Sequence, residues 1–498
     1  MEPETSILGF LENKTILVTG STGFLAKTFM EKILRVQPNV KKFYLLLRAS
    51  DSESARQRLQ TEVVGKEVFR VLKGKWGKDF ESLISKKLIP VQGDVAYENL
   101  GIKDSSLREE MWNDIDIIVN SAATTDFYER YDISLAINTA GALNIMNFAQ
   151  KCIKLKMFLH VSTAYVCGES KGLILEKPFG IGETLKETHS KLDYEFEKQL
   201  AEEKLNKLRA EGITESTITS IMKDFGMERA KLFGWPNTYV FTKAMGEMCL
   251  SAAQSKHNIP IVILRPTMIT STYKEPFPGW IEGLRTIDSV IVGYGKGKLT
   301  CFLADPTMQI DMIPADMVVN AMIVSMVNHA NQYNSGMNIY HVGSSLRNPI
   351  NFSMIHGYSY RCFTEKPLAN KDGTPIKVVK GLVLPNVATF RVFLAIRFVL
   401  PLKILQLVNI IFFRRIFQDV YVNSVRKLKL VLHLVEIYKP YLLFKGIFDD
   451  INSERLHQKA TESYKEMEAF NFDPKCIDWE KYIMNAHIPG LKKYVIRK

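Results

Sequence analysis

The stretch Lys14-Thr-Ile-Leu-Val-Thr-Gly-Ser-Thr-Gly-Phe-Leu-Ala26 predicts a buried strand, a tight glycine turn and the start of a helix. Gly20 lets the backbone turn without a Cβ atom, and Gly23 lets it approach a pyrophosphate. Ala26 is small enough for the helix to pack on the strand, and the free N–H groups of that helix would hold phosphates. A plain loop is the alternative interpretation. The candidate cofactor-binding residues of the turn are Gly20, Ser21, Thr22, Gly23, Phe24 and Leu25.

Length and composition describe a large globular protein. With 498 residues, 46% of them hydrophobic, the chain can bury a sizeable core, and we expect two or more domains. The six cysteines are scattered without a Cys-x-x-Cys pair, so we expect neither a disulfide framework nor a metal site, and a reducing compartment fits best. The acidic start of the chain shows no signal or transit peptide, which predicts synthesis in the cytosol.

Five further apolar runs predict a parallel sheet around the first strand. They cover residues 42–48, 88–95, 115–123, 157–166 and 258–267. Continuous apolar runs are typical of parallel strands that are covered on both faces. The expected fold class is therefore α/β, a Rossmann doubly wound parallel sheet, and the sixth strand completes it in this interpretation.

Two strands end in side chains that suit a dinucleotide. Arg48 follows the second strand, where an Arg can pair with the 2′-phosphate of NADP, so it favours NADPH. A solvated Arg48 is the alternative, and Asp51 leaves NADH open. Asp94, next to Val95, ends the third strand, where its carboxylate would accept from the adenine amino group or cap a helix.

Small or rigid residues mark the ends of two other strands. Ala122 ends the fourth strand with a small side chain, which leaves room for a cofactor. Pro266 ends the last predicted strand, where the backbone would reach the nicotinamide carboxamide. Asn138, in the following helical pattern, is open to interpretation as a structural polar residue only.

Three residues form a candidate catalytic set. Thr163 ends the fifth strand, and Tyr239 and Lys243 share one face of a predicted helix because they are four residues apart. A neighbouring ammonium group lowers the pKa of a phenol, so Tyr239 would act as general acid toward a carbonyl oxygen that also binds Thr163. Lys243 would also hold the cofactor ribose. A Tyr-x-x-x-Lys pair alone is common, but the upstream glycine turn favours the catalytic interpretation.

Four motifs resemble the extended short-chain dehydrogenase/reductases, namely Thr19-Gly-Ser-Thr-Gly-Phe-Leu25, Val161-Ser-Thr-Ala-Tyr165, Tyr239-x-x-x-Lys243 and Leu264-Arg-Pro-Thr267. Five others narrow the resemblance to plant alcohol-forming fatty acyl-CoA reductases over nearly the whole chain, namely Tyr44-Leu-Leu-Leu-Arg48, Gly234-Trp-Pro-Asn-Thr-Tyr239, Lys274-Glu-Pro-Phe-Pro-Gly-Trp280, Asp311-Met-Ile-Pro-Ala-Asp316 and Tyr438-Lys-Pro-Tyr441. The resemblance implies NADPH-dependent reduction of a long-chain acyl-CoA to a primary fatty alcohol through a bound aldehyde, for wax, cutin or suberin-type lipids. Gly20, Gly23, Tyr239 and Lys243 carry over as site residues.

Two regions lie outside this pattern. We expect a reductase domain at residues 1–348, with a helical insertion at about 170–234, and a mostly helical domain at 349–498. The middle of the insertion, residues 191–231, is rich in Glu, Lys and Leu and predicts helices with a break near Gly212. It would cover the active site or the acyl chain; a solvated helical pair is the alternative.

The net charge of +12 is concentrated late in the chain, because residues 391–445 hold ten Lys or Arg against two acids. Residues 387–413 are intensely apolar, but charges interrupt them, so we expect an amphipathic helix with Lys403, Gln406 and Asn409 on one face. This combination predicts a membrane surface as partner and the cytosolic face of the endoplasmic reticulum as location, with the cytosol as alternative. Docking on the reductase domain, or binding of CoA phosphates, are other interpretations. Nothing indicates nucleic acid.

Two other functions remain open at this stage. The same fold and Tyr-Lys pair would serve a reductase that stops at the aldehyde or acts on another carbonyl. A dinucleotide-binding scaffold without activity is disfavoured because Thr163, Tyr239 and Lys243 are all present.

Overall fold

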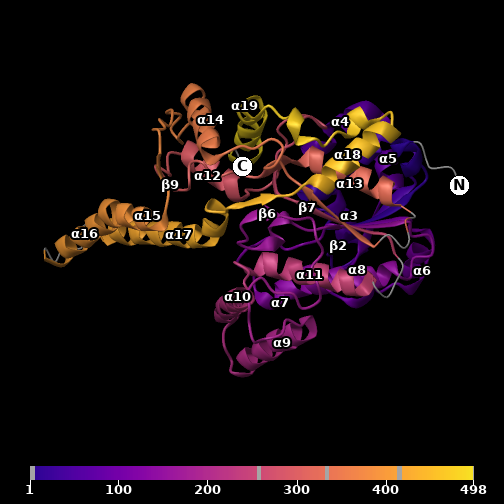
Figure 1. Ribbon diagram of the computed structural model, residues 1–498, viewed down its shortest axis with the longest axis horizontal. Helices are drawn as coiled ribbons and strands as arrows, with labels where there is room; N and C mark the ends of the chain where they lie inside the picture. Colours follow the sequence, from indigo (N-terminus) through magenta and orange to yellow (C-terminus); the bar gives the residue numbers. More distant parts are fainter. Residues whose placement is uncertain (1–5, 255–258, 331, 333–335, 412–417, 497–498) are drawn as a thin grey trace.

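The computed structural model describes residues 6–254, 259–330, 332, 336–411 and 418–496, and its centre is a seven-stranded parallel sheet (Figure 1). The strand order is β11-β7-β5-β4-β1-β2-β3. The strands are β1 (Thr15–Thr19), β2 (Lys42–Leu47), β3 (Leu88–Gln92), β4 (Ile117–Asn120), β5 (Met157–Val161), β7 (Ile261–Pro266) and β11 (Met337–Val342). This order confirms the predicted Rossmann doubly wound sheet.

The strand β11 corrects the prediction that the sheet ends with the run at 258–267. It pairs with β7 in parallel, from Met337 opposite Ile261 to Val342 opposite Pro266. An edge strand has one neighbour, and the first two residues of β11 are only half-buried. It therefore lacks the continuous apolar run that predicts the inner strands. Asn258, at the start of that predicted run, lies outside the described residues.

The sheet has a hydrophobic core on each face. Along β1, Ile16 and Val18 point into the core under α2 (Phe24–Val36) and α13 (Ala315–His329). Leu17 points into the other core, under α8 (Gly141–Ala149) and α11 (Thr238–Gln254), because successive strand side chains face opposite ways. Figure 1 shows α8 and α11 on one side of the sheet and α13 on the other.

The insertion folds as two helices, as predicted. They are α9 (Tyr194–Ala210) and α10 (Glu215–Leu232), and the break between them holds Gly212 with a positive φ of 70°. Only glycine adopts this backbone conformation readily, which explains why the helical pattern stops there. Helix α10 packs against α11, so the insertion lies beside the helix that carries Tyr239 (Figure 1).

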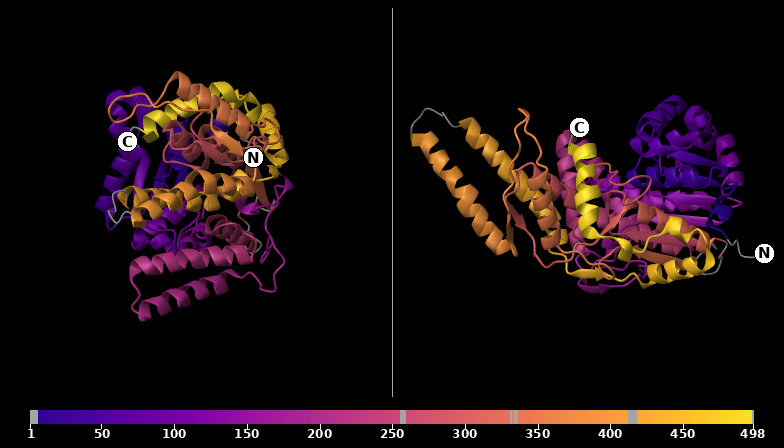
Figure 2. Two further views of the ribbon diagram at one scale, coloured as in Figure 1. Left: turned by 90° about the vertical axis from the view of Figure 1, so that its left-hand side faces the viewer. Right: turned by 90° about the horizontal axis from the view of Figure 1, so that it is seen from above.

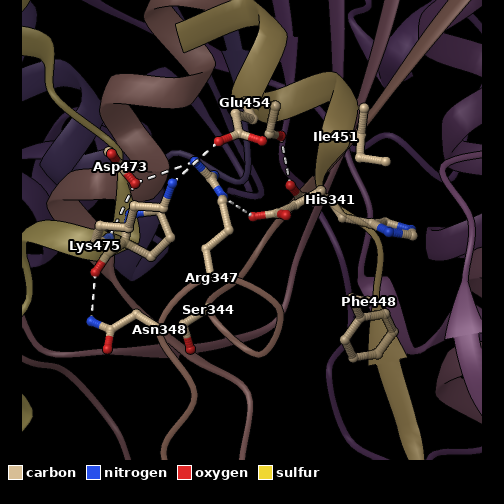
Figure 3. A network of polar contacts seen from close by, with 12 residues as sticks. His341, Ser344, Arg347, Asn348, Phe448, Ile451, Glu454, Asp473 and Lys475 are labelled. Carbon is tan, nitrogen blue, oxygen red and sulfur yellow. Dashed lines mark hydrogen bonds and ion pairs between the residues drawn. The ribbon is translucent and has the colours of Figure 1, made fainter. Parts of the chain in front are cut away.

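The end of the chain returns to the main core. Strand β13 (Gly446–Phe448) pairs in parallel with β6 (Gly172–Ile174) of the insertion, and α18 (Ile451–Ser463) packs on β11 and α13. Arg347 ties the segments together, because its guanidinium donates to Asp450 at 2.7 Å and to Asp473 at 3.2 Å (Figure 3). Residues 446–491 are thus part of the body that contains the sheet.

A pair of helical segments projects from that body, and we call it the helical arm (residues 387–442; Figures 1 and 2). It consists of α15 (Val387–Leu394), a π-helical turn, α16 (Leu400–Ile411) and α17 (Gln418–Leu442), and α16 packs against α17. The segment Val387–Ile410 is long and apolar enough to cross a membrane by length and composition, and little of it is buried. Residues 412–417, with Arg414 and Arg415, lie outside the described residues.

The arm is not amphipathic in the predicted sense. Asn409 is buried, whereas Ile404 and Leu407 are more than half exposed beside Lys403 and Gln406. The reason is that α16 is apolar on nearly every side and α17 covers only part of it. The exposed apolar residues of the arm include Val392, Ile396, Phe398, Leu400, Ile404, Leu407, Ile410, Val420, Val422 and Leu432.

Candidate active site

The glycine turn after β1 is a shaped backbone cradle. Gly20 has a φ of +66°, and a Cβ atom there would lie 2.8 Å from the backbone of Ala122. A Cβ on Gly23 would lie 2.9 Å from the Gly20 carbonyl oxygen, which accepts the Gly23 N–H. No side chain of the described residues caps the first turn of α2, so its N–H groups are available to an anion. These features fit the pyrophosphate of a dinucleotide.

The remaining residues of the turn lie where the cradle needs them. Ser21 donates to the carbonyl of Val18 at 2.9 Å, and Phe24 and Leu25 are buried at the start of α2. The Phe24 ring centroid is 4.9 Å from that of Trp280. Thr22 is half-buried. The turn is therefore held from behind by side chains, while its backbone faces the carboxyl edge of the sheet.

The residues predicted at the other strand ends are spread around this edge. Arg48 is exposed after β2, and its carbonyl accepts from Arg58. Asp94 accepts from the Ala96 N–H at 3.0 Å, so it closes a turn after β3 and caps no helix there. Their roles toward a cofactor stay predictions.

Three further predicted residues support the edge. Val95 is buried, and its carbonyl accepts from Asn144. Pro266 is the last residue of β7. The next backbone N–H, that of Thr267, donates to the Val342 carbonyl. Asn138 has the structural role considered for it. Its side-chain oxygen accepts the Thr124 N–H, and its side-chain nitrogen donates to the Thr124 carbonyl.

Thr163 and Tyr239 meet at the carboxyl end of β5. The Thr163 hydroxyl lies close enough to the phenol of Tyr239 to lower its pKa, and it accepts the Tyr165 N–H at 3.3 Å. Thr163 is buried and Tyr239 half-buried, so the pair faces the edge of the sheet without being shut off from it. The structure thus brings two of the three predicted catalytic residues close together.

Lys243 lies one helical turn from Tyr239. Contrary to the prediction, its ammonium group does not lower the pKa of the phenol. Burial raises the pKa of Tyr239 to about 12, and the influences that oppose this are the nearby Thr163 hydroxyl and the charge of Arg285. Lys243 is almost fully buried and donates to the Val161 carbonyl at 2.7 Å. Burial lowers the pKa of Lys243 to about 8, with Glu247 opposing. Tyr239 therefore stays protonated throughout the physiological range, as a general acid requires.

Sequence reasoning missed four neighbours of these residues. Arg285, before α12 (Thr286–Gly295), lies 4.6 Å above the Phe24 ring. The Phe127 ring stacks on both Tyr239 and Tyr441, with centroids 5.8 and 4.8 Å apart, so the end of the arm reaches the candidate site. His160 is buried beside Lys243, at 3.2 Å from its Nζ atom. Arg285, Phe127 and Tyr441 come from distant segments, and no local spacing marks any of the four.

Known sequences match the chain from end to end. A profile for the NAD-binding part of a family described as "Male sterility protein" matches residues 18–322, and a second profile with that description matches residues 397–498. Fatty acyl-CoA reductase 1 of Arabidopsis thaliana is 55% identical over 498 residues, which are 99% of this chain and all of that protein. The chain belongs to the fatty acyl-CoA reductase family. The alcohol-forming fatty acyl-CoA reductase of Simmondsia chinensis is also 55% identical, over the full length of both chains.

Solved structures agree with the fold of this fatty acyl-CoA reductase family member. The terminal R domain from the myxalamid PKS-NRPS biosynthetic pathway superposes with a TM-score of 0.56 at 18% identity, over 99% of this chain and 95% of that chain. The R domain of a nonribosomal peptide synthetase from Mycobacterium tuberculosis gives 0.56 at 17% identity, over 97% and 92%. At such identities the likeness shows the fold alone. The NAD-binding profile and the glycine cradle together establish an NAD(P)-binding Rossmann domain.

Proposed function

We propose that this protein reduces a long-chain fatty acyl-CoA to a primary fatty alcohol, with NADPH as hydride donor. The observation that carries the proposal is the Thr163–Tyr239 pair at the carboxyl edge of the sheet, in a chain 55% identical to an alcohol-forming reductase over its full length. Residues 20–25 would hold the pyrophosphate, Lys243 the ribose and Arg48 the 2′-phosphate.

The proposed reaction needs two hydrides and two protons for each thioester. NADPH, when bound, supplies the hydrides. The carbonyl oxygen accepts hydrogen bonds from Tyr239 and Thr163, and Tyr239 donates a proton to it as negative charge develops there. The first reduction gives a hemithioacetal, which expels the thiol of CoA and leaves an aldehyde. The same oxygen then stays on Tyr239 for the second reduction, which gives the alcohol.

Product analysis tests this function. Detergent-solubilised protein would be offered C16 to C30 acyl-CoAs with NADPH or NADH, alongside Tyr239→Phe. We expect alcohol, with about two NADPH consumed per product, and a loss of turnover of roughly 10²–10⁴-fold in the variant, which keeps the ring but lacks the proton. Accumulating free aldehyde would contradict the second reduction, and preference for NADH would contradict the assignment of Arg48.

We further propose that the helical arm binds the cytosolic face of the endoplasmic reticulum membrane. Exposed Leu400, Ile404 and Leu407 on α16 support this, because contiguous apolar surface is rare on proteins that face water alone. The basic surplus of residues 391–445 would add attraction to anionic headgroups. A membrane would also dissolve the long-chain substrate next to the arm.

Co-sedimentation with vesicles containing phosphatidylserine tests the arm. The triple change Leu400→Glu, Ile404→Glu and Leu407→Glu removes apolar surface at exposed sites, so we expect a folded protein that no longer sediments. The matched control adds the same charge at exposed polar positions of the arm, namely Gln406→Glu, Gln418→Glu and Asn423→Glu. Equal loss of binding in both variants would show that charge alone acts, and unchanged binding of the first variant would refute insertion of the arm.

A further inference from the structure

A buried chain of hydrogen bonds connects the glycine turn to Lys243. The Ala122 N–H donates to Thr19 Oγ1 at 3.1 Å, and Thr19 Oγ1 lies 2.6 Å from Asn120 Oδ1. Asn120 Nδ2 lies 3.0 Å from His160 Nδ1, and His160 Nε2 lies 3.2 Å from Lys243 Nζ. Thr19, Asn120, His160 and Lys243 are all at most 2% exposed. Water is therefore excluded from these four side chains, and their polar groups must find their hydrogen-bond partners within the protein.

The direction of the first links is fixed by the backbone. The Ala122 N–H can only donate, so Thr19 Oγ1 accepts there and directs its own hydrogen to Asn120 Oδ1. If the Asn120 amide were reversed, Thr19 Oγ1 would face two donors, and its buried hydroxyl hydrogen would have no acceptor among the hydrogen bonds of the described residues. Such an unsatisfied group costs about 1–3 kcal/mol. Asn120 therefore donates from Nδ2 to His160 Nδ1.

The tautomer of His160 follows from this direction. Burial holds the pKa of His160 well below its ordinary value, so its ring is neutral and has one donor and one acceptor nitrogen. Nδ1 accepts from Asn120, which leaves the hydrogen on Nε2. That hydrogen points at Lys243 Nζ, and only an uncharged amine has a lone pair to accept it. The bond from Lys243 to the Val161 carbonyl is compatible with an amine, which still has hydrogens to donate.

We propose that His160, oriented by Asn120 and Thr19, is a positioning residue that keeps Lys243 an uncharged amine above neutral pH, and that Lys243 takes up a proton when a dinucleotide binds. The charged group that acts on Lys243 is Glu247 on α11, which also forms a buried ion pair with Arg265 on β7. The pyrophosphate and ribose of the ligand bring negative charge and acceptor oxygens to this edge, which favour the ammonium form. The proposal rests on the proposed function only in requiring a dinucleotide.

The proton uptake can be measured by titration calorimetry of the full chain with NADPH at pH 9, in two buffers of different ionisation enthalpy. Lys243, with a pKa lowered to about 8, would be largely uncharged before binding. If its pKa returns to about 10.4 in the complex, uptake should be roughly 0.9 proton per dinucleotide at pH 9 and about a tenth of a proton at pH 7. Lys243→Met is the reference variant, and its uptake should be near zero.

Two variants test the hydrogen bonds that connect Thr19, Asn120 and His160 to Lys243. In His160→Gln the amide can turn its oxygen toward an ammonium group, and in Thr19→Val the Asn120 amide is free to reverse. In both variants Lys243 should already be charged before NADPH binds. Proton uptake at pH 9 should therefore fall to half of the wild-type value or less. Wild-type uptake equal to that of Lys243→Met would overturn the proposal, and that comparison stands even where a chain variant does not fold. Unchanged uptake in both folded chain variants would also overturn it. Acyl-CoA is absent, so a wrong substrate assignment leaves this result intact.

Discussion

Replacing Lys243 by Met should change the pH dependence of stability. Lys243 is 1% exposed, and burial lowers its pKa from 10.5 to about 8. At pH 7 the side chain is charged in both the folded and the unfolded protein, and the folded state carries a cost of about 3 kcal/mol, at about 1.4 kcal/mol per factor of ten in proton affinity. The cost declines as pH rises above 8 and is below about 1 kcal/mol at pH 10, because Lys243 is then uncharged when folded.

The variant also loses hydrogen bonds, which acts at every pH. Leaving the partners of Lys243 unsatisfied costs about 1–3 kcal/mol. We therefore expect Lys243→Met to be more stable than wild type by about 1 kcal/mol at pH 7 and less stable by about 1–2 kcal/mol at pH 10. For a protein of 498 residues, each kcal/mol corresponds to about 1 °C in unfolding temperature.

The assay is thermal unfolding at pH 7 and pH 10 with intrinsic fluorescence, in parallel with Lys207→Met. Lys207 is exposed on α9, so its replacement removes a lysine without a burial cost. The control should differ from wild type by the same amount at both pH values. A Lys243→Met variant that is destabilised equally at pH 7 and pH 10 would show that Lys243 has an ordinary proton affinity, and the reasoning would be refuted.

Three further substitutions address the cradle, the phenol and the C-terminal body. Gly20→Ala should weaken NADPH binding at least tenfold in a fluorescence titration, because the added Cβ meets backbone at 2.8 Å and the left-handed φ costs about 1–2 kcal/mol; wild-type affinity would contradict this. Arg285→Met should lower kcat about tenfold whereas Arg285→Lys retains most of it, since the charge favours proton release from Tyr239; equal rates would remove Arg285 from the site. Arg347→Leu should lower the unfolding temperature by about 3–5 °C, because it leaves Asp450 buried without its cation at a cost of about 3–5 kcal/mol, and an unchanged temperature would show that the ion pair is dispensable.

The sequence predicts the inner sheet well because its strands are covered on both faces. Strands such as β1 and β7 are buried at every position and consist mostly of apolar residues, and that pattern is visible without a structure. Strand β11 has a neighbour on one side only and tolerates Asn338 among its apolar residues, so it escapes the same test. In the arm, the spacing of the polar residues alone predicts that Asn409 faces outward. The packing of α17 decides which side of α16 is buried, and that side includes Asn409.

The candidate site shows the same division. Tyr239 and Lys243 are recognisable because four residues make one helical turn, and Thr163 because ligands gather at strand ends. The proton affinities are not recognisable, since they depend on burial and, for Tyr239, on Arg285, which approaches from another element. Spacing therefore predicts which groups share a face, but their charge states require the packing around them.

The end of the helical arm contacts the candidate site. Asn237 caps the start of α11 by accepting the Val240 N–H at 3.1 Å, and it donates to the Tyr441 hydroxyl at 2.7 Å. Phe127 is stacked between Tyr441 and Tyr239. These contacts therefore link the end of α17 to Tyr239, the proposed general acid. A deletion from residue 387 onward would remove this contact together with β13 and α18, so lost membrane binding and lost activity would be inseparable. Substitutions on the exposed side of α16 leave the contact in place, so they would separate the proposed attachment to a membrane from catalysis.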